Sequence, residues 1–502
     1  MMSSLYIGAT GIKSHGEGMA VITNNLANVN TVAFKQQSMQ YSDLVSQYVS
    51  ADSNLLTNIS QCGAGARPNS IRTLFIQGGL EKGNEATDIS IEGSGFFGVT
   101  RNNQIHYTRA GNFRFTEKGE LFDPNGWTLL GHAITDGVES PKIVPIVLDL
   151  GENGKNGQMA AQATTSLTSC SQLGGLENLN DNPANPFFSM AAAWNGLASP
   201  PLADSRYSYH EPFQFYDSNG ELRNGSIYYD LAGKSGGVSA VEYIVAFDPA
   251  LDASSRANTA SAGLLMAGTI SFSSAGEISA LTAFLPPESG SPADLDSWST
   301  ASLSDGYPVF AVHPTDAKPQ DISLNMGLAL FGDASGGLAS PDDAASDPAV
   351  FYAVDGTATR NPLSSIFYGS SCSSIMSKKD GHAEGKLRSV AIDKDGTISG
   401  SYTNGEQLEL FRISLYRFTS QDGLQNEGNN HYSATPEAGE IEEGVPGTEN
   451  FGSVAQYSLE GSNVDYAREF SLMIITQRGF QMNSKVVTTS DEMLRKALEL
   501  KR

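Results

Sequence analysis

The residue types that most often perform catalysis or bind metals are scattered along this sequence. Its 7 histidines form no HxxxH or HExxH pair, and its 3 cysteines, Cys62, Cys170 and Cys372, lie far apart without a CxxC pair. Zinc sites and metal-dependent hydrolases need such close pairs to place several ligands around one ion. We therefore expect no catalytic residue, no metal ligand and no bound cofactor.

Two loops match ligand-binding motifs only in part. Residues 393–396 (DKDG) begin like a calcium loop, but Asn404 stands where an EF-hand requires glutamate. Because a strand-forming run follows them, a type I′ hairpin turn is the better interpretation. Gly63 and Gly65 follow no convincing strand and lack a later glycine at the spacing of a phosphate-binding loop.

Charge and length exclude further classes of protein. The net charge of −24 and the isoelectric point of about 4.6 disfavour contact with nucleic acid or an anionic membrane surface. We expect no membrane insertion and no cleaved signal peptide, because the N-terminus lacks a basic region followed by an apolar run. A chain of 502 residues should form two to four domains.

Both ends of the chain carry apolar residues at the seven-residue spacing of a helical stripe. We expect these assembly helices to present Leu5, Ile12, Met19, Ile22, Leu26 and Val29 near the N-terminus, and Tyr466, Met473, Phe480, Val487 and Leu494 near the C-terminus. Such a stripe also occurs in ordinary core packing. Its position at both extreme ends favours pairing of the two helices with each other and with neighbouring copies.

The sequence between the two ends reads mostly as β-structure. Short apolar runs separated by glycine and asparagine turns predict antiparallel strands on both sides of a long acidic insertion. That insertion, residues 151–370, contains 23 acidic and 7 basic side chains. The expected fold is multidomain and nested: a coiled-coil terminal domain (1–30 and 462–502), connecting segments (31–70 and 451–461), a discontinuous β-domain (71–150 and 371–450), and an acidic β-rich inserted domain (151–370) with one or two subdomains.

Three motifs carry a resemblance to a known family. They are NNLANVNTVAFK at 24–35, GSGFF at 93–97, and the C-terminal run that begins SNVD at 462–465. Together they resemble the bacterial flagellar rod and hook proteins. The motif residues are Asn24, Asn25, Ala27, Asn28, Phe34, Lys35, Gly93, Gly95, Phe96, Phe97, Ser462, Asn463, Val464, Asp465, Gln477, Arg478 and Gln481.

The chemistry of these motifs is structural. An asparagine cluster just past an apolar stripe suits a helix that ends and turns, after which Phe34 would anchor the chain and Lys35 would lie on its polar side. Ser462 or Asn463 can cap the C-terminal helix, with Asp465 favouring its positive N-terminal dipole. The polar residues at 477, 478 and 481 could bridge subunits or form a solvated face, and both interpretations stay open.

The resemblance implies a non-catalytic subunit that polymerises with itself into the curved flagellar hook and transmits motor torque. It also implies export of the uncleaved chain through the flagellar type III apparatus to the hook outside the cell. The implied partners are further copies of the chain, the distal rod protein, the hook cap and the hook-filament junction proteins.

Two alternatives have other functions. A distal rod protein shares the terminal motifs but usually lacks a large insertion, so length favours the hook. The insertion could instead be a glycan-binding or hydrolytic module, for which the adjacent pair Asp342 and Asp343 is weak support.

Overall fold

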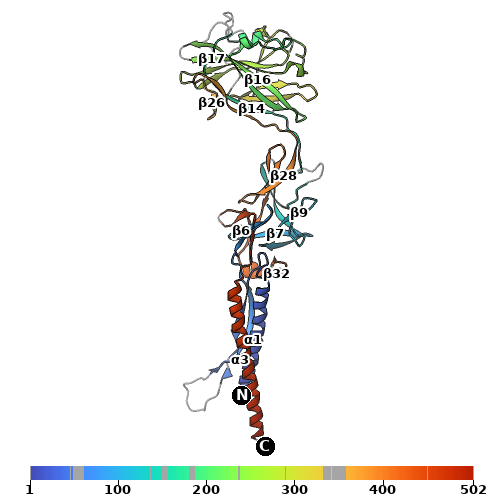
Figure 1. The fold of residues 1–502 in the computed structure, drawn as a ribbon, viewed down its shortest axis with the longest axis vertical. Helices are drawn as coiled ribbons and strands as arrows, with labels where there is room; N and C mark the ends of the chain where they lie inside the picture. The colour runs from blue at the N-terminus through green and yellow to red at the C-terminus, as the bar shows by residue number, and fades with distance from the viewer. Residues whose placement is uncertain are drawn as a thin grey trace. The chain divides into compact units, whose positions relative to one another are not determined.

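A computed structural model of the chain describes residues 2–45, 47–48, 61–135, 137–149, 157–179, 187–235, 238–288, 290–331, 341, 358–448 and 450–500. The chain forms two compact units (Figure 1). The first unit combines Met1–Gln158 with Leu387–Arg502, and the second is Met159–Lys386. Most described elements are strands, and a long helix lies near each end of the chain.

The two long helices, α1 (Met2–Ala27) and α3 (Tyr466–Glu499), pack side by side in the first unit (Figure 1). Glycines allow their close approach. A Cβ added to Gly8 would lie 2.9 Å from the side chain of Val487, and one added to Gly479 would lie 2.6 Å from the ring of His15. Because low residue numbers of α1 meet high numbers of α3, the helices are antiparallel.

A β-hairpin covers a second side of α1. Its strands are β1 (Gln37–Asp43) and β4 (Ala66–Thr73), which pair antiparallel, and the short pair β2 (Gln47–Tyr48) and β3 (Gln61–Cys62) lies between them in sequence. Ser14 Oγ on α1 donates a hydrogen bond to the carbonyl of Ala66 at 3.1 Å. Part of the segment expected only to connect domains therefore has regular structure.

The β-structure of the first unit is built from both halves of the chain. Strands from before and after the inserted unit pair repeatedly: β5 with β36, β6 with β35, β7 with β31, β8 with β33 and β11 with β30. Their bounds are β5 (Leu80–Lys82), β6 (Ile89–Glu92), β7 (Phe96–Arg101), β8 (Gln104–Thr108), β9 (Arg114–Phe115), β10 (Leu121–Phe122), β11 (Thr128–Thr135), β12 (Val138–Pro145), β28 (Gly385–Ile392), β29 (Thr397–Tyr402), β30 (Gln407–Ile413), β31 (Leu415–Phe418), β32 (Leu424–Gly428), β33 (His431–Ala434), β34 (Ile441–Gly444), β35 (Ser453–Gln456) and β36 (Ser458–Glu460). A buried cluster that includes Phe97, Leu129 and Ile413 joins the two halves.

The predicted type I′ turn at 393–396 is wrong. A type I′ turn requires positive φ at both central residues, and here only Gly396, at φ 76°, has a positive φ. The backbone N–H of Gly396 donates to the carbonyl of Asp393, and that of Asp393 donates to the carbonyl of Thr397. This longer turn lets Asp395 bind the Thr397 hydroxyl through its carboxylate.

The second unit consists of two sheets over a shared apolar core. The larger sheet has the order β15-β16-β17-β18-β20-β21, with β19 beside β18, and the smaller has the order β22-β23-β24-β14-β27. Their bounds are β14 (Ser166–Leu173), β15 (Tyr209–Tyr216), β16 (Leu222–Ser235), β17 (Val238–Phe247), β18 (Leu264–Phe272), β19 (Ile278–Leu281), β20 (Phe284–Leu285), β21 (Ser299–Thr300), β22 (Leu303–Ser304), β23 (Tyr307–Val312), β24 (Gln320–Asn325) and β27 (Cys372–Lys379). The short pair β25 (Leu328–Leu330) and β26 (Ala358–Arg360) and helix α2 (Ser189–Ala193) also lie in this unit, whereas the strand β13 (Gln158–Met159) pairs with β28.

This unit ends later than the expected insertion. Strand β27 pairs antiparallel with β14 from Leu167 to Leu173, so it belongs to the second unit although it follows residue 370. The composition of β27, which is rich in serine and lysine, resembles the flank more than the acidic insertion. Strand pairing between distant segments therefore sets this boundary, and local composition does not reveal it.

Candidate assembly site: the terminal helices and their polar junction

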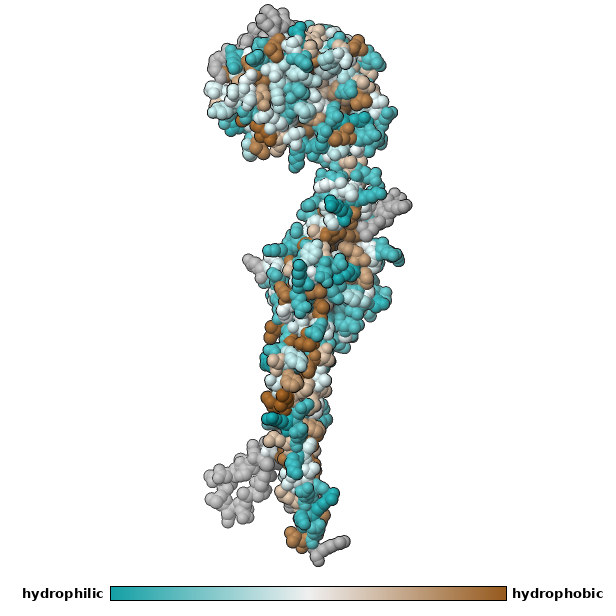
Figure 2. Space-filling view, viewed as in Figure 1, coloured by the Kyte–Doolittle hydropathy of each residue, from teal (hydrophilic) through white to brown (hydrophobic). Residues whose placement is uncertain are grey.

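Helix α3 rests on α1 along a narrow strip and leaves a broad apolar surface uncovered. Among its described residues only Glu469 and Ser490 are buried. Ile475 is 65% exposed and Met482 is 71% exposed, and Figure 2 shows hydrophobic residues scattered over the surface of these helices. The other exposed large apolar residues of the C-terminal helix are Tyr466, Phe470, Leu472, Ile474, Phe480, Val486, Met493 and Leu498, with Leu500 just beyond it.

Most residues of the predicted stripes are half-buried at or beside the contact between the helices, where Val487 approaches Gly8. The buried positions of α1 are Gly8, Ser14, Gly18, Val21 and Asn25. On the predicted N-terminal stripe Leu5, Ile12, Met19, Ile22 and Leu26 are half-buried, as are Met473, Val487 and Leu494 on the C-terminal stripe. Tyr466 and Phe480 are exposed. Glycine and serine line the closest contact, which leaves most larger side chains at its edges.

Val29 was predicted to continue the N-terminal stripe, but it lies beyond the helix, which ends at Ala27. Asn28 explains the end, because its side-chain Nδ2 donates to the carbonyl of Asn24 at 2.9 Å and its backbone N–H bonds the carbonyls of Asn24 and Asn25. Asparagine side chains that bind nearby backbone commonly terminate helices. The asparagine cluster thus acts at the helix end, two residues before the last position of the predicted stripe.

Glu460, at the end of β36, is the centre of a buried ionic cluster. Its Oε1 lies 2.5 Å from Lys35 Nζ and accepts the backbone N–H of Gly78 at 2.9 Å. Its Oε2 accepts from Arg109 Nη1 at 3.3 Å. The backbone carbonyl of Glu460 also accepts the N–H of Ala33 at 2.7 Å. One carboxylate therefore joins the segment after α1, the strand before α3 and the β-domain.

Lys35 was expected on the polar side of the chain, and its ammonium group lies among polar groups in the interior. The side chain of Lys35 is buried, and its Nζ also donates to the carbonyl of Ile76 at 2.9 Å. Burial lowers the pKa of Lys35 below its ordinary value, although the Glu460 carboxylate opposes this shift. A buried cation needs a paired anion, and Glu460 supplies it from a position 425 residues away.

A second polar cluster holds the start of α3 against the end of α1. Asn25, which is buried, accepts the backbone N–H of Gln37 at 2.9 Å and donates to the carbonyl of the same residue at 2.8 Å. Its Nδ2 also donates to Glu469 Oε2 at 3.2 Å. Glu469 in turn accepts from the Gln36 side chain at 2.5 Å. Asn25 therefore connects α1, β1 and α3 through one side chain.

Asn463 forms a similar connection just before α3. Its Oδ1 accepts the backbone N–H of Gln36 at 2.7 Å, and its Nδ2 donates to the carbonyls of Leu74 and Ile76 at 2.8 and 2.9 Å. The side-chain amide of Asn463 therefore joins its own backbone segment to the segments at Gln36 and at residues 74–76. We call Glu460, Asn25 and Asn463, together with their side-chain and backbone partners Lys35, Gln36, Arg109 and Glu469, the polar junction.

The cap of α3 is Asp465, and the prediction of Ser462 or Asn463 at that position is wrong. Asp465 Oδ1 accepts the backbone N–H groups of Ala467 and Arg468 at 2.9 and 3.1 Å. The side chain of Asn463 is occupied by the junction, and Ser462 Oγ accepts the N–H of Val464. Asp465 is thus both the cap and the favourable charge at the helix start.

The glycine motif connects the junction to the apolar core. Gly93 and Gly95 have φ values of 117° and 134°, which side chains rarely tolerate. The carbonyl of Gly93 accepts Arg109 Nη2 at 2.7 Å. The next two residues, Phe96 and Phe97, are buried in two separate apolar clusters. The two glycines therefore form a turn that contacts Arg109 on one side and leads into the buried strand β7 on the other.

The remaining motif residues lie on the surface or at its edge. Gln477, Arg478 and Gln481 occupy the exposed face of α3, where both predicted roles stay open. Asn24 and Ala27 are exposed, and Phe34 and Val464 are buried. Sequence reasoning missed Glu460, Glu469, Gln36 and Arg109. An acidic residue two positions before the SNVD motif was the one available signal for Glu460.

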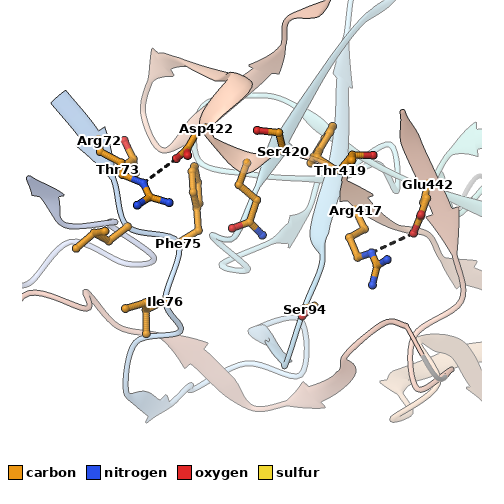
Figure 3. Close-up of a pocket in the computed structure, with 13 residues that line it drawn as sticks. Arg72, Thr73, Phe75, Ile76, Ser94, Arg417, Thr419, Ser420, Asp422 and Glu442 are labelled. Carbon is orange, nitrogen blue, oxygen red and sulfur yellow. Dashed lines mark hydrogen bonds and ion pairs between the residues drawn. The ribbon is translucent and has the colours of Figure 1, made fainter. Parts of the chain in front are cut away.

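A groove of about 780 Å³ lies beside the junction in the first unit (Figure 3). Arg72 Nε pairs with Asp422 and Arg417 Nε with Glu442, both at 3.0 Å, while Phe75 lies between the two pairs in the view of Figure 3. Such exposed ion pairs contribute little stability. No group of histidine, cysteine, aspartate or glutamate side chains in the described part of the chain could hold a metal ion.

Asp342 and Asp343, the weak candidates for hydrolysis, lie outside the described residues. No helix within the described ranges is long and apolar enough to span a membrane.

Family models match three parts of the chain. Residues 90–154 match the flagellar hook protein FlgE/F/G D1 domain, residues 178–382 the flagellar basal body protein FlaE D2 domain, and residues 455–500 the flagellar basal body rod FlgEFG protein C-terminal region. The last match contains α3 and part of the polar junction.

Relatives that align with this chain over their whole length are named flagellar hook protein FlgE. The chain is 27% identical over 516 residues to the flagellar hook protein FlgE of Borreliella burgdorferi, and 29% identical over 521 residues to that of Treponema pallidum. Both alignments cover 100% of this chain and 100% of the relative. A crystal structure of Helicobacter pylori flagellar hook protein FlgE2 aligns with a TM-score of 0.44 and 13% identity, covering 76% of this chain and 100% of that one. The chain belongs to the family of bacterial flagellar hook proteins, which are structural proteins rather than enzymes.

Proposed function

We propose that copies of this chain polymerise into the flagellar hook through the uncovered apolar face of α3, with α1 beside it in a coiled-coil-like pair. The observation that carries this proposal is the exposure of large apolar side chains along a helix of 34 residues. Large apolar side chains exposed in this number along one helix are costly in water and favour an interface. Neighbouring copies provide the matching surface.

The polar junction gives this interface a mechanical role. Asn25, Asn463 and Glu460 tie both helices to the β-domain through charged and amide side chains of low exposure. Force applied to the helices then passes into the β-domain through several hydrogen bonds in parallel. This arrangement supports transmission of motor torque along a polymer whose subunits are held by their ends.

The remaining parts of the proposal concern the route and the partners. We infer that the chain leaves the cell through the flagellar type III apparatus and assembles under a hook cap, between the distal rod and the hook-filament junction proteins. The nested, acidic second unit would lie at the outer radius, where water and salt screen its charge. Full-length relatives named as hook proteins support the hook over the distal rod as the place of assembly.

A pair of substitutions on one helix tests the proposal. Ile475→Asp places a charge on the apolar face, and Thr488→Asp places the same residue at an exposed position whose neighbours one helical turn away are polar. Both positions are exposed in the single chain, so both variants should fold. We expect Ile475→Asp to abolish polymer formation in electron micrographs and Thr488→Asp to retain it. Equal polymerisation by both variants would contradict the proposed interface.

A deletion strain tests the place of assembly. Cells that lack this chain should build a complete rod without a hook, as seen by electron microscopy of purified basal bodies. A truncated rod would instead assign the chain to the distal rod.

A further inference from the structure

Two buried carboxylates face each other inside the second unit. Asp230 on β16 and Glu242 on β17 are direct partners in the antiparallel register, and they are 2% and 1% exposed. Because side chains of partnered residues lie on the same face of a sheet, both point toward one apolar cluster. That cluster includes Ala240, Ile244 and Ala246 from the same strand as Glu242. Paired acids are unusual in such surroundings, since each charge loses its hydration.

Glu242 holds a short segment that covers this face, residues 187–194, which we call the strap. Glu242 Oε2 accepts the backbone N–H of Met190 at 2.9 Å, and Oε1 accepts that of Ala191 at 2.8 Å. The hydroxyl of Ser189 lies 3.4 Å from Oε2. The strap contains α2, so one carboxyl group binds the first turn of this short helix.

The rest of the strap is attached by apolar and aromatic contacts. Phe188 meets Phe284 edge-on with ring centroids 5.7 Å apart. Trp194 Nε1 donates to the carbonyl of Ala262 at 3.0 Å. Phe188 and Met190 are fully buried in this state. Release of the strap would therefore expose apolar side chains that are now sealed against the sheet.

The surroundings of Glu242 oppose the ionisation of its carboxyl group. Burial raises the pKa of Glu242 from its ordinary 4.5 to about 8, the strap hydrogen bonds oppose this rise, and the nearby Asp230 adds to it. In the described part of the chain Glu242 forms no ion pair with a lysine, arginine or histidine. Asp230 is the acid that faces it from β16, and the tyrosine Tyr228 packs against the same cluster.

We propose that Glu242 is a pH-sensitive latch: the closed strap buries it in a neutral state beside Asp230, and its ionisation at higher pH favours release of the strap, which uncovers the apolar cluster. The latch lies within the second unit and does not depend on the proposed mode of polymerisation.

The direction and steepness of the response follow from linkage. An acid with a raised pKa in the closed state stabilises that state fully below its ordinary pKa and loses this contribution as pH rises toward the closed-state value. Between about pH 5 and pH 8 each opening of the strap releases a proton from Glu242. The opening equilibrium should therefore rise by up to about tenfold per pH unit in this range and level off above it.

Hydrogen exchange of the full chain, read by mass spectrometry at pH 5 to 9 and corrected for intrinsic exchange rates, measures this opening. Peptides that contain Met190 and Ala191 should lose protection by up to about tenfold per pH unit until pH 8. Glu242→Gln should remove the pH dependence, because the amide cannot ionise. The control Glu277→Gln changes an exposed acid of the same unit and should keep the wild-type response.

The variant Asp230→Asn provides a second test of the latch. Removing the facing charge lowers the cost of ionising Glu242, so the total loss of protection between pH 5 and pH 9 should be smaller. An unchanged pH response in Glu242→Gln would overturn the proposal. If Glu242→Gln does not fold, the wild-type chain still tests the proposal. Hydrogen-exchange protection of the strap that stays constant between pH 5 and pH 8 would overturn the latch.

Discussion

Replacing the acid at the centre of the polar junction should destabilise the first unit more than replacing its lysine partner. Glu460 balances two buried cations, Lys35 and Arg109, and also accepts the backbone N–H of Gly78. Glu460→Gln leaves both cations without an anion in a buried site. Lys35→Met leaves a balanced pair of Arg109 and Glu460. The two changes remove members of the same contact, but their consequences differ.

The expected magnitudes differ by about a factor of two at the centres of their ranges. Removing one partner of a buried ion pair costs about 3–5 kcal/mol because the other charge stays buried, and this is the cost expected for Glu460→Gln. For Lys35→Met we expect about 1–3 kcal/mol, mainly because the carbonyl of Ile76 loses its donor. The surface pair of Arg72 and Asp422 has about half of each side chain exposed, so Asp422→Asn should cost about 1 kcal/mol or less.

Urea unfolding of the full chain, followed by hydrogen exchange and mass spectrometry, separates the two units. Peptides of the first unit should show a midpoint lowered by about 1–2 M in Glu460→Gln, given typical urea slopes. Peptides of the second unit should unfold at an unchanged midpoint and provide an internal control. The reasoning is refuted if Glu460→Gln is no more harmful than Lys35→Met, or if Asp422→Asn is equally harmful.

Three further predictions follow from single observations. Asp465→Ala should cost about 1 kcal/mol at the start of α3, seen as faster exchange of the Ala467 amide, and an unchanged rate would contradict the assignment of the cap. Asp123 accepts from the buried His431 at 2.7 Å, and although burial raises its pKa, its hydrogen bonds outweigh this and lower the pKa below the ordinary 3.8. Its contribution should be complete at neutral pH and decline as pH falls through the folded-state pKa, so Asp123→Asn should lower the unfolding midpoint less at pH 3 than at pH 7. An equal effect at both pH values would exclude this linkage. Joining the chain across 159–386 with a short glycine-serine linker should still give tubes with altered curvature, whereas an exported variant that forms no tubes in any salt concentration would assign the second unit to the assembly core.

Much of the secondary structure follows from local pattern. The apolar spacing near both ends corresponds to the long helices, and the turn-separated apolar runs correspond to strands on either side of the inserted unit. These features depend on residues within one or two turns of each other. A single sequence therefore contains the information needed to predict them.

Contacts between distant residues were not predictable in the same way. The burial of Lys35 could not be predicted, because nothing near it in sequence shows that Glu460 will pair with it. The boundary of the second unit at Lys386 depends on the pairing of β27 with β14, and the composition of β27 does not reveal it. The cap of α3 was assigned to the wrong residue because Asn463 is used by a long-range contact, which leaves Asp465 as the cap.

The most direct test of the account is a structure of the assembled polymer at side-chain resolution. The account predicts that Ile475 and Met482, which are 65% and 71% exposed in the single chain, become buried against helices of neighbouring copies. It also predicts that the ion pair of Lys35 and Glu460 is retained in every subunit. A polymer in which the apolar face of α3 stays in contact with solvent, while subunits meet only through their β-domains, would contradict the central claim.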